Sequence, residues 1–219
     1  MIATFFPDQA FGWVFITALL GFLAAACYTD SLRMRIPKAI TLSALGVGLL
    51  FNLVRGVWLG GAGEPVWLFG ANGSFVGALD GFLFALTGML AGFTLMLVMW
   101  LLGTCGGGDV KLFAAIGVWL GPKFALYVWL VTIPLVILIA FYLWVRRVLS
   151  GEKRPTALRQ EKRKGKPAAE NWQPKSRLVA YSIPVAVATA LVLLWVFRFE
   201  LGMAPPRADN FEVQAHAAK

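Results

Sequence analysis

Residues 75–102 read FVGALDGFLFALTGMLAGFTLMLVMWLL, an apolar stretch in which Asp80 is the single charged residue. A helix needs about 20 consecutive apolar residues to cross the hydrocarbon core of a membrane, which is about 30 Å thick. The whole chain has the same character, because 59% of its 219 residues are hydrophobic and 14% are charged. Soluble domains usually carry about 25% charged residues. The composition therefore excludes a water-soluble globular domain.

Further apolar runs cover residues 11–28, 40–54, 110–121, 124–145 and 178–199. We predict an all-α polytopic membrane protein with six transmembrane helices, in which residues 1–199 form the membrane domain and residues 200–219 a flexible tail. The first run has no basic residues before it, so we expect it to be retained rather than cleaved as a signal peptide. The run 110–121 measures about 18 Å as a helix and cannot cross unaided. We expect its helix to start earlier, or one of its ends to lie inside the membrane.

Basic residues are concentrated in one predicted loop, residues 146–177. It holds eleven Lys or Arg and three Glu, which gives it +8 of the net charge of +9. It has too few apolar residues to fold on its own, so we expect a flexible loop. The positive-inside rule places this loop, and the basic residues Arg33, Arg35 and Lys38, in the cytoplasm, with both termini on the other side. The expected partners of the loop are anionic lipid head groups rather than nucleic acid.

Three acidic residues lie beside or within the apolar runs: Asp30, Asp80 and Asp109. An aspartate near the centre of a membrane helix costs about 2.5 to 3.5 kcal/mol, so each needs an explanation. In the predicted topology Asp30 and Asp109 lie on the cytoplasmic side and can meet. Asp80 lies toward the other side, where we expect an interfacial or capping role. Two carboxylates that share a site cannot easily both ionise, so one can act as an acid while the other activates water.

The residues around Asp109 and Asp30 add detail to this candidate site. Taken alone, Asp109 is better explained as a helix N-cap, where carboxylates bind free N–H groups. Gly106 and Gly108, however, let the backbone there approach a peptide closely. Lys111 either favours the charged form of Asp109 or reaches lipid head groups. Pro37 suits the first turn of the second helix.

Three motifs resemble those of the type IV prepilin peptidases, the bacterial branch of the GxGD aspartic proteases. They are Asp30 followed by Ile36-Pro37, Gly106-x-Gly108-Asp109-x-Lys111-Leu112, and Tyr181-Ser182-Ile183-Pro184. The resemblance implies an inner-membrane endopeptidase that removes the basic leader of type IV prepilins or pseudopilins at the cytoplasmic face. It also implies that Asp30 and Asp109 are the two catalytic aspartates. Such a dyad requires no metal and no organic cofactor.

The resemblance is to the short, peptidase-only form found with tight-adherence pili. Longer members carry a domain with paired CxxC motifs and methylate the new pilin N-terminus, whereas this sequence has two cysteines, Cys27 and Cys105, and no CxxC. We therefore expect no N-methyltransferase activity. The family usually has Asn after the Ile-Pro pair, where this chain has Lys38. Pro134 and Pro184 are expected to kink the last two helices, with Pro184 beside the active site.

Two other functions remain compatible with the sequence. A presenilin-like protease that cuts within transmembrane segments shares the Gly-x-Gly-Asp motif, although the residue before Asp30 is Thr29 rather than Tyr. A non-enzymatic membrane subunit could instead bind a proton or cation at the aspartates. The position of the cut, before or inside the apolar stretch of a substrate, separates the two proteases. The sequence predicts neither the pilin nor the oligomeric state.

Overall fold

The computed structural model describes residues 5–33, 37–70, 73–103, 105–149 and 181–203. These residues form α1 (Gln9–Arg33), α2 (Lys38–Gly61), α3 (Ser74–Leu101), α4 (Gly107–Leu149) and α6 (Ser182–Val196). No strand occurs among them, so the prediction of an all-α fold is confirmed. Ile36, most of the basic loop 146–177 and most of the tail 200–219 lie outside the described residues.

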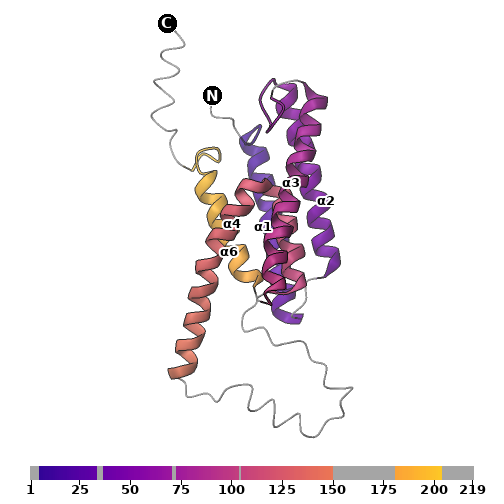
Figure 1. Ribbon diagram of the computed structural model, residues 1–219. Coiled ribbons are helices and arrows are strands. Elements are labelled where there is room, and N and C mark those ends of the chain that lie inside the picture. The colour runs from indigo at the N-terminus through magenta and orange to yellow at the C-terminus, as the bar shows by residue number, and fades with distance from the viewer. Residues whose placement is uncertain (1–4, 34–36, 71–72, 104, 150–180, 204–219) are drawn as a thin grey trace.

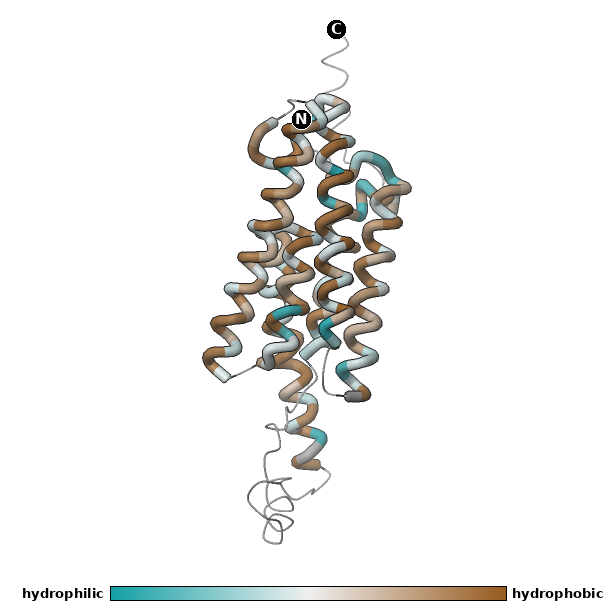
Figure 2. Tube along the Cα trace, turned by 90° about the vertical axis from the view of Figure 1, so that its right-hand side faces the viewer, coloured by the Kyte–Doolittle hydropathy of each residue, from teal (hydrophilic) through white to brown (hydrophobic). Residues whose placement is uncertain are grey.

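Four of the helices are long and apolar enough to cross a membrane: Gln9–Leu32, Lys38–Gly61, Ser74–Leu101 and Gly107–Arg146. The remaining described helix, α6, is apolar but has 15 residues. Hydrophobic residues cover the helices over most of their length, and hydrophilic residues gather mainly toward the ends (Figure 2). The chain is therefore a helical membrane protein, and the number of six crossings stays a prediction.

The helix α4 is a hairpin of two arms. Its backbone is non-helical at Gly121, where φ is 74° and ψ is 176°. Figure 1 shows the chain rising to this break and descending after it. The predicted runs 110–121 and 124–145 therefore belong to a first arm, residues 107–120, and a second arm, residues 122–149. The first arm begins earlier than its apolar run, as expected, and measures about 21 Å.

Two features of the sequence fix this hairpin. A Cβ atom at Gly121 would overlap the ring of Phe84, and the positive φ also favours glycine. Pro122 has no N–H, so the carbonyl oxygen of Val118 lacks its helical donor. The side chain of Asn52 in α2 replaces it, because Nδ2 donates to Val118 O at 2.9 Å and to Trp119 O at 3.2 Å. A buried amide thus satisfies backbone groups that no water can reach in a bilayer.

The helix α3 packs closely against both α2 and the first arm through glycines. Cβ atoms at Gly56 or Gly60 of α2 would overlap the backbone at Gly73 and Gly77. A Cβ atom at Gly88 of α3 would overlap the carbonyl oxygen of Gly117 in the first arm. Small residues allow this close approach of helices, which is the usual way to pack helices in membranes.

The helix α2 extends past the predicted run 40–54 and includes Arg55. The apolar run ends at Val54 in the sequence, whereas the helix continues through the charged Arg55 to Gly61. Arg55 is only 1% exposed, with its guanidinium carbon 4.2 Å from the ring centre of Phe5 and 4.5 Å from that of Phe84. Its Nη1 also donates to the carbonyl oxygen of Phe5 at 3.4 Å. Cation–π contacts of this kind compensate for part of the lost hydration.

The bundle has two distinct ends (Figure 1). We call the site end the one where α1, α3 and the second arm finish and where α2, the first arm and α6 begin. The opposite end holds the joint between α2 and α3 and the first and last described residues, whereas the break at Gly121 lies beside Phe84 and Gly88, near the middle of α3. There the carboxylate of Glu200 accepts hydrogen bonds from the N–H groups of Phe5 and Phe6.

Candidate active site

Asp30 and Asp109 both lie at the site end of the bundle and are both buried. Asp30 is in the last turn of α1 and 3% exposed, and Asp109 is in the first turn of α4 and 2% exposed. Two complete helices, α2 and α3, lie between these aspartates in the sequence. The fold therefore brings them to one end from distant parts of the chain. Their location at a common end agrees with the expectation from the charge pattern.

Asp109 caps the first arm from within its first turn. The carbonyl oxygen of Gly106 accepts the N–H of Val110 at 3.3 Å, which makes Gly106 the N-cap residue. In return, Oδ2 of Asp109 accepts the N–H of Gly106 at 2.9 Å. This is half of a capping box, and the helix dipole there favours a negative charge. The sequence suggested Asp109 as the N-cap residue itself, and this is wrong: Gly106 is the N-cap, and Asp109 is the third helical residue, with the half-buried Gly108 between them.

Asp30 is tied to the start of α6. The hydroxyl of Ser182, the first residue of α6, donates to Oδ2 of Asp30 at 2.7 Å. Cys27 lies three residues before Asp30, and its thiol donates to the carbonyl oxygen of Ser182 at 3.3 Å. A hydrogen bond from a neutral hydroxyl to a carboxylate is short and strong, and it fixes the orientation of the acid.

Tyr181 connects the start of α6 with Asp109. Burial, with smaller contributions from the nearby acidic groups of Cys105 and Asp109, raises the pKa of Tyr181 to about 12. The phenol is therefore neutral at physiological pH and close enough to Asp109 to sense its charge. Two neighbouring residues thus interact with the two acids. Ser182 donates a hydrogen bond to Asp30, and Tyr181 senses the charge of Asp109.

The two prolines near the site occupy helix starts. Pro37 is the N-cap of α2, with φ −59° and ψ 140°, one position before the expected first turn. Pro184 is buried and is the third residue of α6. We expected Pro184 to kink a helix interior, and this is wrong, because the first turn of a helix needs no N–H from that position. Pro134 does lie inside the second arm.

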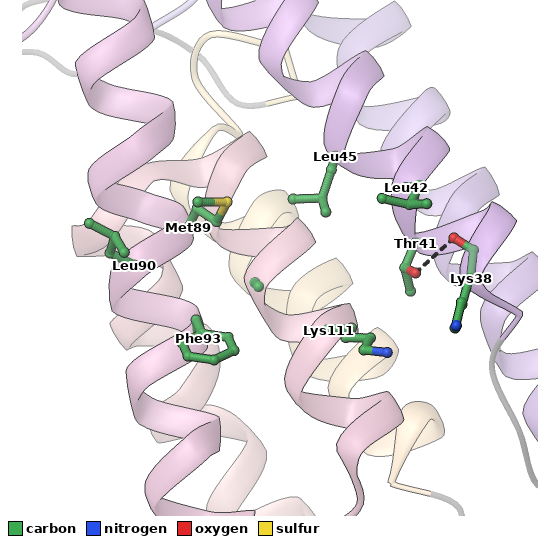
Figure 3. Close-up of a pocket in the computed structure, with 9 residues that line it drawn as sticks. Lys38, Thr41, Leu42, Leu45, Met89, Leu90, Phe93 and Lys111 are labelled. Carbon is green, nitrogen blue, oxygen red and sulfur yellow. Dashed lines mark hydrogen bonds between the residues drawn. The ribbon is translucent and has the colours of Figure 1, made fainter.

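Lys111 lines a cavity that neither Asp30 nor Asp109 lines, and Asp80 lies at the opposite end of the bundle. Lys111 is exposed and lines a cavity between α2, α3 and the first arm, together with Lys38 (Figure 3). Asp80 is at the opposite end, where its carboxylate accepts N–H groups of Trp67 at 2.7 Å and Leu68 at 2.9 Å. The expectation that Asp80 caps backbone away from the site is confirmed. Among the described residues no group of three or more His, Cys, Asp or Glu could hold a metal ion.

The model of the type IV leader peptidase family matches residues 17–143 of this chain, which is more than half of it. The chain belongs to the type IV leader peptidase family. The matched range contains Asp30, Asp109 and Lys111 but ends before α6. A leader peptidase family model thus covers both acids, whereas the contribution of α6 to the site comes from the structure.

A curated relative is the prepilin leader peptidase/N-methyltransferase of Pectobacterium carotovorum subsp. carotovorum. It is 34% identical over 110 residues, which are 47% of this chain and 32% of the relative. The aligned part therefore spans about a third of the length of that relative. No solved structure matched the chain.

Three neighbours of the acids were not among the predicted site residues: Cys27, Tyr181 and Ser182. Tyr181 and Ser182 belong to the late motif that carried the resemblance, but the motif alone does not say which side chain meets an acid. Cys27 precedes Asp30 by three residues, a spacing that places both on one helix face. That spacing was the available signal for Cys27.

Proposed function

We propose that this protein is a membrane aspartic endopeptidase that cleaves the basic leader of type IV prepilins or pseudopilins. The observation that carries the proposal is the burial of Asp30 and Asp109 at one end of the bundle, where Ser182 at the start of α6 donates a hydrogen bond to Asp30. Membership of the leader peptidase family supports the reaction class. The name of the curated relative supports a prepilin as the substrate.

In the proposed mechanism the two carboxylates share one proton. The ionised acid removes a proton from a water molecule, and that water attacks the carbonyl carbon of the scissile peptide bond. The protonated acid gives its proton to the leaving nitrogen as the C–N bond breaks. General acid–base action of this kind typically contributes about 10² to 10⁴ in rate. The pair titrates as a unit, so the proton belongs to the dyad rather than to one named residue.

The structure supports roles for two supporting residues in this mechanism. Ser182 donates to Asp30 and so holds that carboxylate in one orientation while the reaction proceeds. Gly106 binds Asp109 through its backbone N–H, which fixes the second carboxylate at the start of the first arm. Positioned groups matter because misplacement of a reacting group by about 1 Å can cost 10²-fold in rate.

We further propose that the site end faces the cytoplasm of a bacterial inner membrane and that both termini lie on the other side. The helix α4 ends and α6 begins at the site end, and residues 150–180 between them in the sequence contain nine of the twenty Lys and Arg of the chain. The positive-inside rule places such a segment in the cytoplasm. With the arms of α4 counted separately and α6 included, this arrangement has six membrane helices, of which the first arm, about 21 Å long, ends inside the hydrocarbon core. The basic segment is then positioned to contact anionic lipids.

For these 219 residues we propose peptide cleavage without N-methylation, since the sequence contains no CxxC motif of the kind that the longer members carry. Incubation of the cleaved pilin with a methyl donor and this protein tests the point. The proposal predicts no gain of 14 mass units, about one methyl group, at the new N-terminus. A methylated product would contradict it.

The function is tested by incubating the detergent-purified protein with full-length type IV prepilins and locating the cut by mass spectrometry. The proposal predicts one cut between the basic leader and the apolar segment. A cut inside the apolar segment would favour a presenilin-like protease instead. Ion-dependent binding without any cut would favour a non-enzymatic membrane subunit.

A further inference from the structure

An apolar groove opens between α2 and α3 at the site end, and two lysines lie at its mouth. Its cavity has a volume of about 470 Å³. The first arm of α4 forms its floor, as Figure 3 shows. The walls and mouth include Leu42, Leu45, Leu90, Phe93, Lys38 and Lys111. The side chains of Lys38 and Lys111 come from different helices and lie on the same side of the cavity (Figure 3).

The groove continues into the membrane-spanning part of the bundle. A second cavity of about 370 Å³ shares Leu42, Leu45 and Met89 with the first and reaches Leu49 and Phe82. We call the two cavities together the α2–α3 groove. From Lys38 to Leu49 the helix α2 rises about 17 Å. This is close to half of the ~30 Å hydrocarbon core, which is the depth of one lipid leaflet.

The groove ends there for a structural reason. Beyond Leu49 the helices α2 and α3 meet through Gly56, Gly60 and Gly77, where no side chain fits between the backbones. A Cβ atom at Gly81 would likewise overlap the carbonyl oxygen of Asn52. Toward the site end the two helices diverge, and the first arm lies behind the gap (Figure 3). The α2–α3 groove is therefore a wedge that is open at the lysines and closed near mid-membrane.

We propose that the α2–α3 groove binds one anionic phospholipid from the leaflet at the site end, with its phosphate between Lys38 and Lys111. Each lysine near a membrane surface adds attraction to anionic lipid, and an acyl chain matches the apolar walls. The depth favours this occupant over a transmembrane peptide, which would need to follow the full thickness of the core. Lys38 and Lys111 place positive charge at the level of the lipid phosphates of that leaflet. This site is separate from the acids and does not depend on the proposed peptidase activity.

The proposal is tested by native mass spectrometry of the full chain in detergent with phosphatidylglycerol and phosphatidylcholine of the same acyl chains. We expect bound phosphatidylglycerol to persist at concentrations where phosphatidylcholine is lost. The variant Lys38→Gln/Lys111→Gln should bind phosphatidylglycerol about 30-fold more weakly, and each single variant about fivefold. The matched control is Lys123→Gln, which removes an exposed lysine that does not line the α2–α3 groove and should bind as the unaltered protein does.

A second variant tests the acyl part of the site. Leu45→Trp fills the groove without changing charge, and it should weaken binding of both lipids while the unfolding temperature stays close to that of the unaltered protein. Equal retention of the two lipids by the unaltered protein, or normal binding by the double lysine variant, would overturn the proposal. Displacement of the lipid by a prepilin apolar segment, with no effect of the lysine variants, would assign the groove to a peptide and also overturn it. None of these measurements uses cleavage, so failure here is distinguishable from failure of the proposed function.

Discussion

The two ends of the bundle use their carboxylates in different ways. At the opposite end Asp80 accepts three successive backbone N–H groups, from Trp67, Leu68 and Phe69, and Glu200 accepts those of Phe5 and Phe6. At the site end Asp109 also accepts a backbone N–H, that of Gly106, whereas Asp30 receives a side-chain hydroxyl from another helix. Carboxylates saturated by backbone donors hold loops in place. A carboxylate that meets an adjustable side chain is better suited to exchange a proton during a reaction.

Arg55 adds to the structural character of the opposite end. Its guanidinium lies over the rings of Phe5 and Phe84, and it binds the carbonyl oxygen of Phe5. The N-terminal segment is thus held from two directions, by Arg55 through its carbonyl and by Glu200 through its N–H groups. Among the residues described by the structure, no charged side chain at the site end lies over aromatic rings in this way, and Ser182 is held to α1 by Asp30 and Cys27 instead. Activity and stability should therefore respond separately to changes at the two ends.

The largest expected effect is on cleavage. Asp30→Asn removes one member of the acid pair and should lower the rate of prepilin cleavage about 10³-fold. Asp80→Asn, at the opposite end, should cleave at close to the unaltered rate per folded molecule. The measurement is the initial cleavage rate in detergent, with folding checked by gel filtration. Comparable losses in both variants would remove the proposed difference between the ends.

The next effect is on stability, where we expect Asp80→Asn to have the larger effect and Asp30→Asn the smaller one. Asp80→Asn should lower the free energy of unfolding by about 3 kcal/mol, because several buried N–H groups lose their charged acceptor. Asp30→Asn should cost about 1 kcal/mol, since it affects one hydroxyl bond. Denaturant titration of both proteins in the same detergent measures the difference. Unaltered stability of Asp80→Asn would mean that its carboxylate does not hold the 64–69 loop.

Ser182→Ala should have a smaller effect on catalysis. Loss of the hydroxyl that orients Asp30 should lower kcat about tenfold with little change in KM, which corresponds to one charge-assisted hydrogen bond. Ser182→Thr keeps the hydroxyl and serves as the control that should restore kcat. If both variants lower KM and kcat alike, Ser182 would only stabilise the start of α6.

Tyr181→Phe should have the smallest effect and tests the pH dependence. The pKa of Tyr181 is raised by burial from 10.0 to about 12, so its phenol stays neutral over the working range of the enzyme. Folding favours the neutral form of this phenol, so its contribution to the free energy of unfolding is complete below pH 10. That contribution is lost as the pH rises toward 12, where the phenol ionises in the folded protein. The pH–rate profile of Tyr181→Phe below pH 10 should therefore keep its shape. Disappearance of an alkaline limb in this variant would contradict the assignment.

Much of this arrangement follows from the sequence because membrane proteins obey simple rules. Apolar runs predicted the helices, and the charge pattern predicted that Asp30 and Asp109 share one end while Asp80 does not. The boundary at Arg55 was missed because a charge ordinarily ends a membrane segment, whereas here aromatic rings accommodate it. The hydrogen bond from Ser182 to Asp30 joins residues 152 positions apart, and no local pattern predicts it. The placement of Pro184 in a first turn depended on where α6 begins, which composition alone does not determine.

The most direct test of the account is a comparison of the cleavage rates of Asp30→Asn, Asp109→Asn and the double variant. If the two acids act as one unit, removing both should cost no more than removing either, because the unit is already inactive. The account therefore predicts three losses of similar size, each about 10³-fold, in proteins that still fold. A single variant that keeps its activity, or a double variant whose loss is the product of two smaller ones, would contradict the shared site.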